Sequence, residues 1–267
     1  MPGRRGRAGE VRNVMTKSMN ARAQSEGPGT IWHNSGETDR PAGPPPPVRP
    51  AEALVRLAPV TVSMPVSPVP PMLRACRLLD GWIAGSSLAS NEPVLDVRDF
   101  GWTDALRRDW SAIRDEALTL AVEGTPPLAP CGIIPLWRNG RALDDRIAAC
   151  PRTAEALAAV PGLHDAGFAL LAPGAHVAPP RGATKALISC HLGLVVPRDG
   201  GARMRVRDRI VRWAEGQTLV FDDTFPHEVW NEAEAMRLVL RLRFVRPLRQ
   251  PGRGIANGIL RLFGAIL

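Results

Sequence analysis

Apolar residues recur every three to four positions between residues 99 and 121, in "DFGWTDALRRDWSAIRDEALTLA". This spacing predicts an amphipathic helix, whose apolar stripe contains Trp102, Leu106, Trp110, Ile113, Ala117 and Leu120. A second, shorter helix is expected over 150–162, "CPRTAEALAAVPG", where Pro151 begins the helix or Thr153 caps it.

From Ala166 onward the helical period ends and short strand-like runs take its place. Seven short runs rich in Val, Leu and Phe follow one another, separated by turns that contain Gly, Pro or Asp: 166–173, 185–197, 202–208, 209–216, 217–223, 227–232 and 236–245. Strands at such regular spacing, without helices between them, are typical of an all-β sandwich or barrel. In "RLVLRLRF" arginine alternates with apolar residues, so one face of that strand is buried and the other is solvated or lines a cleft. We therefore expect an all-β jelly roll with flanking N-terminal helices.

The two ends of the chain differ from its middle in charge and composition. Residues 1–73 carry nine Lys/Arg against five Asp/Glu, and residues 246–267 carry four Arg and no acid. The segment from Pro41 to Leu73 has 11 prolines, which favour extended conformations over a packed core. We expect 1–73 to be disordered, or to precede the true start of translation, and 74–247 to form the folded domain. Because residues 74–245 hold 21 charges of each sign, the domain itself is not predicted to bind nucleic acid.

Residues 248–267 form a basic amphipathic tail, with Ile255, Ile259 and Leu262 at helical spacing. This tail either docks on the domain or contacts a membrane surface. The four cysteines are scattered, and the N-terminus lacks the apolar region of a signal peptide. The expected location is the bacterial cytoplasm or the periphery of the inner membrane.

The stretch "FDDTFPHEVWNE", residues 221–232, places two acids and a histidine at the start of a Val-Trp strand. Taken alone it is either part of a metal site or a tight turn with a surface histidine. Its neighbours add "HLGLVVP" at 191–197, "WAEGQTLVFDDTFPHEVW" at 213–230 and "RLVLRLRFVRP" at 237–247. Together these motifs resemble the aspartyl/asparaginyl β-hydroxylase family, and the resemblance extends over about 99–247.

The resemblance implies a double-stranded β-helix of the cupin-like kind that uses Fe(II) and 2-oxoglutarate. By this resemblance His227 is an iron ligand, and Asp223 matches an acid that lies near a water molecule bound to the metal. Arg237 matches an arginine that binds a carboxylate of 2-oxoglutarate, for which a guanidinium is well shaped. His191 matches a histidine that also holds this cosubstrate. Asp222 is expected to anchor the turn.

Two positions depart from the family pattern. Pro180 stands where the family has its other iron-binding histidine, and Ser189 stands where it has a second cosubstrate-binding arginine. His176 and His191 are the alternatives for the missing ligand, although His176 is about 13 Å from position 180 in an extended strand. Arg181 and Lys185 are the alternatives for the missing positive charge.

These residues are compatible with two functions. One is an Fe(II)/2-oxoglutarate-dependent dioxygenase that hydroxylates a peptidyl Asp/Asn, a lipid or a small-molecule C–H bond with an incomplete metal site. The other is a catalytically inactive family member that binds a ligand or partner. Intact His227, Asp223, His191 and Arg237 favour the first, whereas Pro180 and Ser189 favour the second.

Overall fold

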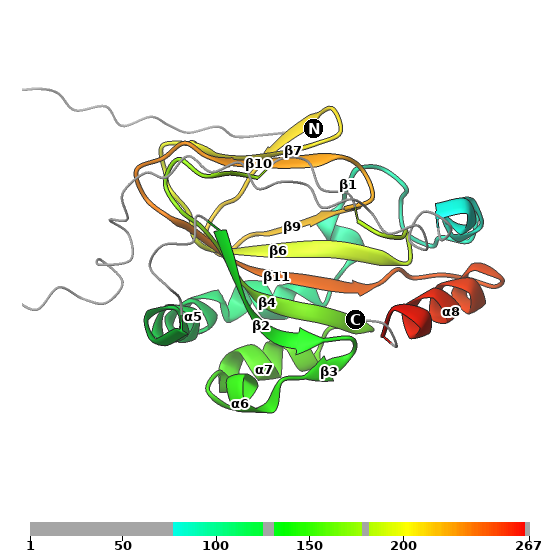
Figure 1. Cartoon of the computed structure of the whole chain (residues 1–267), viewed down its shortest axis with the longest axis horizontal. Helices are drawn as coiled ribbons and strands as arrows, with labels where there is room; N and C mark the ends of the chain where they lie inside the picture. Colours follow the sequence, from blue (N-terminus) through cyan, green and yellow to red (C-terminus); the bar gives the residue numbers. More distant parts are fainter. Residues whose placement is uncertain (1–76, 125–130, 178–181, 265–267) are drawn as a thin grey trace, which may run out of the picture. The chain divides into compact units, whose positions relative to one another are not determined.

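A computed structural model of the chain describes residues 77–124, 131–177 and 182–264. Two antiparallel sheets dominate this part of the chain (Figure 1). The larger sheet has the order β1-β9-β6-β11-β4-β2-β3 and the smaller has the order β5-β10-β7-β8. Their bounds are β1 Val94–Leu95, β2 Cys131–Arg138, β3 Arg141–Ala142, β4 Leu163–Leu171, β5 His176–Val177, β6 Leu187–Val195, β7 Ala202–Val206, β8 Arg209–Arg212, β9 Thr218–Phe221, β10 His227–Asn231 and β11 Arg237–Val245.

Eight consecutive strands, β4 to β11, alternate between the two sheets, and only β7 and β8 follow each other in the same sheet. This alternation produces the order β9-β6-β11-β4 opposite β5-β10-β7-β8. It is the connectivity of a double-stranded β-helix, so the predicted jelly roll is confirmed. The predicted strands within 166–245 are all present, whereas β1, β2, β3 and the two-residue strand β5 were not predicted.

Helices cover the outer face of the larger sheet (Figure 1). They are α4 Thr103–Arg108, α5 Trp110–Gly124, α6 Asp144–Ala148 and α7 Pro151–Ala158, with short 3-10 turns η1 Arg77–Leu79 and η2 Val97–Asp99 elsewhere. The helix expected over 99–121 is thus divided at Asp109. Helix α7 begins at Pro151 as expected, and the carboxylate of Glu116 in α5 accepts hydrogen bonds from the backbone N–H groups of Arg152 and Thr153. This contact caps α7 from a neighbouring helix.

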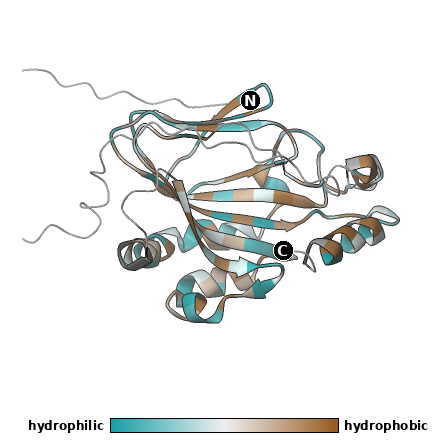
Figure 2. Cartoon of the chain, in the orientation of Figure 1, coloured by the Kyte–Doolittle hydropathy of each residue, from teal (hydrophilic) through white to brown (hydrophobic). Residues whose placement is uncertain are grey.

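The two faces of the larger sheet have different partners, because successive side chains of a strand point to opposite sides. Cys190 and Leu192 of β6 pack with the helices, and Figure 2 shows the apolar and polar residues alternating along the strands. Ser189 and His191 therefore face the smaller sheet. The interior between the sheets holds a second apolar cluster that includes Met204, Phe221 and Val239.

The C-terminal helix α8, Gly252–Gly264, packs on α3, Asp80–Gly85. Ala256 and Ile259 bury their side chains with Ile83 and with Ala186 beside the start of β6. The part of the tail that the structure describes is therefore docked on the domain. None of the helices in the described ranges has the length and apolarity needed to span a membrane.

Candidate functional site

A cavity of about 520 Å³ lies between the two sheets of the jelly roll. Its walls are largely apolar and include Leu170, Val177, Met204, Phe221 and Val229. Six polar or charged side chains also line it: Ser189, His191, Asp223, His227, Arg237 and Arg241. Four of these, His191, Asp223, His227 and Arg237, are the residues that the sequence singled out, so the fold brings them together in one space.

The turn between β9 and β10 is fixed by Asp222, as the sequence predicted. Its fully buried carboxylate accepts hydrogen bonds from Arg246 at 2.5 Å and from Lys185 Nζ at 2.7 Å. The backbone N–H of Thr224 donates to the same carboxylate at 3.0 Å. Because Lys185 is paired here, its ammonium does not supply the positive charge that was considered for it. Arg181, the other alternative for that charge, lies outside the described residues.

Asp223 is the next residue of this turn and points into the cavity. The hydroxyl of Ser189 donates to its Oδ2 at 2.8 Å, and the backbone N–H of Gly182 donates to its carbonyl at 2.7 Å. A Cβ at Gly182 would lie 2.0 Å from Asp223 Oδ1, so only glycine fits against this carboxylate. The hydroxyl of Ser189 thus holds the carboxylate of Asp223 in place.

His227 begins β10, and its side chain faces the cavity along with that of Val229. Its Nδ1 lies 3.1 Å from the carbonyl oxygen of Phe225. A carbonyl can only accept, so Nδ1 carries the proton and Nε2 of the neutral ring keeps a free lone pair. Metal-binding histidines usually have this arrangement, in which the second ring nitrogen donates to a backbone carbonyl.

His191 has the opposite tautomer. Trp213 Nε1 donates to its Nδ1 at 3.3 Å, so in the neutral ring the proton is on Nε2. That Nε2 is buried and has no hydrogen-bond partner among the described residues. Burial, together with the charges of Arg237 and Arg241, lowers the pKa of His191 well below its ordinary value, so the ring is neutral. His191 is therefore built to donate a hydrogen bond, and in this tautomer it does not offer a lone pair to a metal.

Arg237 begins β11 and is only 5% exposed. Its guanidinium lies 4.6 Å from the centre of the Trp213 ring, and its Nε has no hydrogen-bond partner among the described residues. Burial lowers the pKa of Arg237 to about 10, which still leaves it charged at neutral pH. A buried cation without a paired anion is costly, so this geometry favours binding of an anion.

His176 lies outside the cavity, although it was one of the alternatives for the missing iron ligand. It is on β5 beside Val177, whose side chain takes the inward direction. The His176 ring stacks on Trp230 at 5.4 Å, and its Nε2 lies 2.7 Å from Glu228 Oε1. This residue therefore belongs to a hydrogen-bonded and stacked cluster with Glu228 and Trp230 outside the cavity.

The fit of these residues to an iron ion is incomplete. In the described ranges no three His, Cys, Asp or Glu side chains are grouped closely enough to hold a metal. Among the described His, Asp and Glu side chains of the cavity, His227 and Asp223 are the candidate ligands, because His191 is a donor and His176 points outward. The thiol of Cys131 also lines the cavity, but burial raises its pKa and so disfavours the thiolate that binds a metal. Position 180, where a proline was noted in place of a histidine, lies outside the described residues.

Two residues of the site were not predicted from the sequence: Trp213, which lies behind the cavity wall, and Arg241, which lines the cavity. Trp213 contacts both His191 and Arg237, but it is 22 residues from one and 24 from the other, so no local pattern reveals these contacts. Arg241 was visible only as part of the alternation in β11, which allowed either a solvated face or a cleft.

Comparison with known proteins places these features in a family. The profile of the family described as Aspartyl/Asparaginyl beta-hydroxylase matches residues 107–247. The ornithine lipid ester-linked acyl 2-hydroxylase of Rhizobium tropici is 31% identical over 188 residues, which are 64% of this chain and 67% of that protein. Human aspartyl/asparaginyl beta-hydroxylase is 30% identical over 166 residues, but these are 55% of this chain and only 22% of the human protein.

Among solved structures, a Pseudomonas putida prolyl-4-hydroxylase aligns with a TM-score of 0.34 and 26% identity, over 55% of this chain and 88% of that one. A Cupin_2 domain of an Enterobacter cloacae transcriptional regulator aligns with a TM-score of 0.31 and 16% identity, over 43% and 97%. The family profile spans more than half of the chain and includes the turn, His227 and Arg237. The chain belongs to the aspartyl/asparaginyl β-hydroxylase family.

Proposed function

We propose that this protein is a 2-oxoglutarate-dependent hydroxylase, and that its cavity binds the cosubstrate through Arg237 and His191. One observation carries the proposal: two buried donors without partners, Arg237 Nε and His191 Nε2, line the same cavity. A carboxylate accepts hydrogen bonds from both groups and neutralises the guanidinium. The neutral state of His191 suits this role, since a protonated ring would add a further charge to the apolar interior.

The residues of the chain have separable tasks in this proposal. Arg237 and His191 bind and orient a carboxylate, while Trp213 holds both side chains in place. Ser189 keeps the Asp223 carboxylate turned toward the cavity, and the apolar walls exclude water from it. In this family an iron ion supplies the oxidising chemistry when it is bound. His227 Nε2 and Asp223 are the described groups that would hold it.

A second candidate function is binding without catalysis, and the incomplete set of metal ligands favours it. The same cavity would then retain a dicarboxylate as a ligand and would release no product. Binding of the cosubstrate does not distinguish the two functions, but binding of iron does.

The substrate is proposed from the lining of the cavity. Its walls carry Leu170, Val177, Met204 and Val229, whereas its two arginines both lie on β11. An acyl chain packs on such walls better than an acidic peptide side chain does. One relative is named as a lipid acyl 2-hydroxylase, which agrees with an aliphatic C–H bond as the target.

The test begins with anaerobic binding of Fe(II) and 2-oxoglutarate by the full chain and by His227→Ala, measured by calorimetry and metal analysis. We expect one iron per chain, lost in the variant, and succinate release once oxygen is admitted. Dicarboxylate binding without iron above the level of the variant would establish the binding-only function. Failure to bind 2-oxoglutarate would refute both functions as stated. Acyl lipids and Asp-containing peptides, added in turn, would then be compared by the succinate they release.

We also infer a contact with an anionic lipid surface beside α3 and α8. Leu78 and Trp82 are 82% and 63% exposed, and both line a shallow groove with Arg249. Arg253 and Arg261 on α8 are exposed and add positive charge. Exposed aromatic and aliphatic side chains next to arginines suit an interface with acidic head groups.

Co-sedimentation with vesicles of phosphatidylglycerol and of phosphatidylcholine tests this contact. We expect binding to the anionic vesicles only, reduced at least several-fold by Trp82→Ser. Ile210→Ser is the matched control, because Ile210 is 50% exposed on β8, away from this groove. Equal loss in both variants, or binding to neither vesicle, would contradict the inference.

A further inference from the structure

One carboxylate bound at Arg237 and His191 leaves the other end of a dicarboxylate to be recognised. Ser189 is not available for this purpose, since its hydroxyl is bonded to Asp223. Lys185 is bonded to Asp222. Apart from Arg237, Arg241 is the one Lys or Arg among the described residues that line the cavity.

Arg241 lies on β11 four residues after Arg237, and both side chains point to the same face of the strand. Their Cα atoms are about 13 Å apart at 3.3 Å per residue. In the antiparallel ladder of β6 and β11, Arg241 pairs with His191, and the next residue on that face, Arg243, pairs with Ser189. The charges of Arg237 and Arg241 both lower the pKa of His191, after burial itself. The neutral ring of His191 is therefore flanked by two guanidinium groups.

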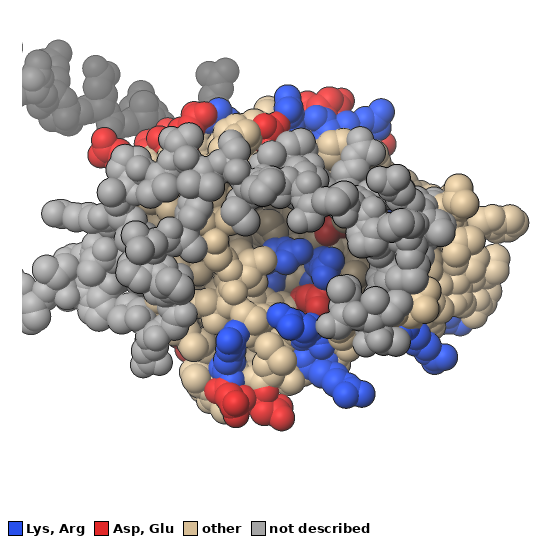
Figure 3. Space-filling view, in the orientation of Figure 1, with Lys and Arg blue, Asp and Glu red and all other residues tan. Residues whose placement is uncertain are grey.

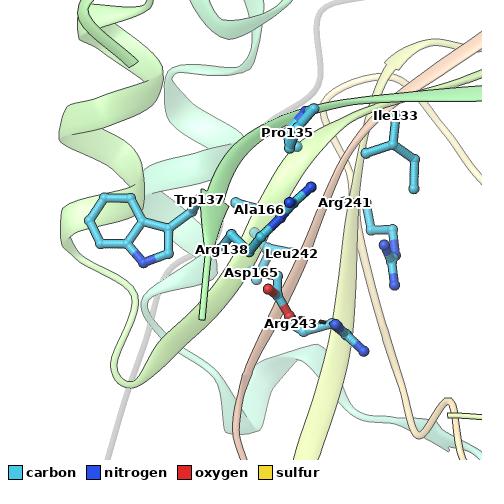
Figure 4. A pocket seen from close by; sticks show the side chains of 10 residues that line it. Ile133, Pro135, Trp137, Arg138, Asp165, Ala166, Arg241, Leu242 and Arg243 are labelled. Atoms are coloured by element: carbon cyan, nitrogen blue, oxygen red, sulfur yellow. Dashed lines mark hydrogen bonds and ion pairs between the residues drawn. The ribbon is translucent and has the colours of Figure 1, made fainter. Parts of the chain in front are cut away.

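The surroundings of Arg241 differ from those of its neighbour Arg243. Arg243 is paired with Asp165 at 2.5 Å, whereas no hydrogen bond or ion pair to the guanidinium of Arg241 is found among the described residues. In Figure 4 Asp165 points toward Arg243, and Arg241 lies apart from that pair. Arg241 is partly buried, and this burial lowers its pKa, as expected for a cation that is partly removed from water without gaining a bonded anion.

Arg241 also stands at a boundary between two spaces. It lines the main cavity and a smaller hollow of about 230 Å³ next to it, together with Ile133. The smaller hollow is bordered by Arg138, Arg243 and one acid, Asp165, so its arginines outnumber its carboxylates. Figure 3 shows basic side chains, with fewer acidic ones, in a hollow of this face. An anion that reaches Arg241 from the main cavity is therefore met by a positive local field.

We propose that Arg241 binds the second carboxylate of the dicarboxylate whose first carboxylate is held by Arg237 and His191. The proposal rests on the proposed function of the same cavity and adds the group that distinguishes a dicarboxylate from a monocarboxylate. The positive charge that is absent at position 189 is supplied from β11, the neighbouring strand of the same sheet. Arg241 is a ligand-binding residue in this scheme.

The test compares two ligands of equal length by calorimetry on the full chain, without metal: 2-oxoglutarate and 2-oxopentanoate, which lacks the second carboxylate. The variants are Arg241→Gln, Arg241→Lys and Arg237→Gln. Arg209→Gln is the matched control. Arg209 lies on the exposed strand β8, where it pairs with Glu92, and it does not line the cavity. Thermal unfolding of each variant establishes that it is folded. We expect Arg241→Lys and Arg241→Gln to fold, since neither substitution breaks an ion pair between described residues.

We expect the wild-type protein to prefer 2-oxoglutarate, and Arg241→Gln to lose roughly 10- to 100-fold of that affinity. The affinity of Arg241→Gln for 2-oxopentanoate should be unchanged. A general structural defect would instead lower the affinity for both ligands. Arg241→Lys should recover part of the preference, because the charge remains while the two-pronged contact is lost. Arg237→Gln should lower the affinity for both ligands.

The outcomes separate this inference from the function on which it rests. If Arg241→Gln binds 2-oxoglutarate as tightly as the wild-type protein while Arg237→Gln does not, the role of Arg241 is refuted and the proposed function stands. If Arg241→Gln lowers the affinity for both ligands equally, Arg241 maintains the structure of the cavity and does not recognise the second carboxylate, so the inference is also refuted. If the wild-type protein binds neither ligand, the proposed function fails together with the inference.

Discussion

Replacing Asp222 with alanine should destabilise the protein more than any other single change at the turn between β9 and β10. The carboxylate is completely buried, and so is the guanidinium of Arg246 that lies 2.5 Å from it. In Asp222→Ala that guanidinium keeps its hydrogen bonds to the carbonyls of Lys185 and Ser90 but loses its counter-charge.

Breaking a buried pair by removing one partner costs about 3–5 kcal/mol. A native domain is stabilised by only about 5–15 kcal/mol in total, so this loss is a large fraction of it. With a urea m-value of about 3 kcal/mol/M, a loss of about 4 kcal/mol moves the unfolding midpoint down by about 1.3 M.

Urea unfolding followed by tryptophan fluorescence and circular dichroism measures this shift. The decisive comparison is the double variant Asp222→Ala with Arg246→Met, which removes the fully buried charge of Arg246 and retains most of its side-chain volume. The ammonium of Lys185, which is 17% exposed, loses the Asp222 carboxylate in both variants and so does not affect the comparison. We expect the double variant to be more stable than Asp222→Ala alone. A loss below about 1 kcal/mol in Asp222→Ala, or strictly additive losses in the double variant, would refute the reasoning from burial.

Three further predictions concern the surroundings of the cavity. Burial by itself raises the pKa of Asp165, but the hydrogen bond with His164 and the charge of Arg243 outweigh it and hold that pKa well below its ordinary value. The stabilisation is therefore complete above the unfolded-state pKa of about 4 and is lost as the pH falls further, so urea titrations at several pH values should show Asp165→Asn less stable than wild type at pH 7 and the difference shrinking below pH ~4. Cys131 lines the cavity, and burial raises its pKa, so peptide mass spectrometry should show slow alkylation at pH 8 that 2-oxoglutarate suppresses; unchanged labelling with saturating ligand would contradict the site. Gly182→Ala places a Cβ 2.0 Å from the Asp223 carboxylate and should cost roughly 1–3 kcal/mol of stability, whereas a wild-type midpoint in thermal unfolding would show that the loop moves freely away.

Periodicity predicted the parts of the fold in which one face of an element is buried. Strand β7 and the second half of β11 alternate between buried and more exposed residues, and the helix stripe of Leu106, Ile113 and Ala117 is buried as expected. The break at Asp109 escaped notice because the apolar stripe continues on both sides of it. Strand β2 was missed because its sequence, "CGIIPLWR", contains glycine and proline, which normally indicate a loop.

The motifs identified four residues of the cavity, but the tautomers of its two histidines depend on contacts that form only in the folded protein. The tautomer of His191 is set by Trp213, and that of His227 is set by the carbonyl of Phe225. The contact between His191 and Trp213 joins residues 22 positions apart, so it cannot be predicted from the sequence around His191. The inward direction of Arg241 became clear only from the pairing of β11 with β6.

The antiparallel pairing of β6 with β11 has a consequence for how relatives of this protein are compared. Where β6 and β11 pair, a point on the inner surface of the sheet can be reached from two strands whose paired residues, such as His191 and Arg241, are 50 positions apart in the chain. A charge that disappears from one column of an alignment can reappear in a distant column without moving far in space. Position-by-position scoring would consider the serine at 189 alone, whereas a count of charges facing the cavity would include the guanidinium of Arg241 on β11. Surveys for inactive members of such families should therefore compare the composition of the inner surface, not the identity of single columns.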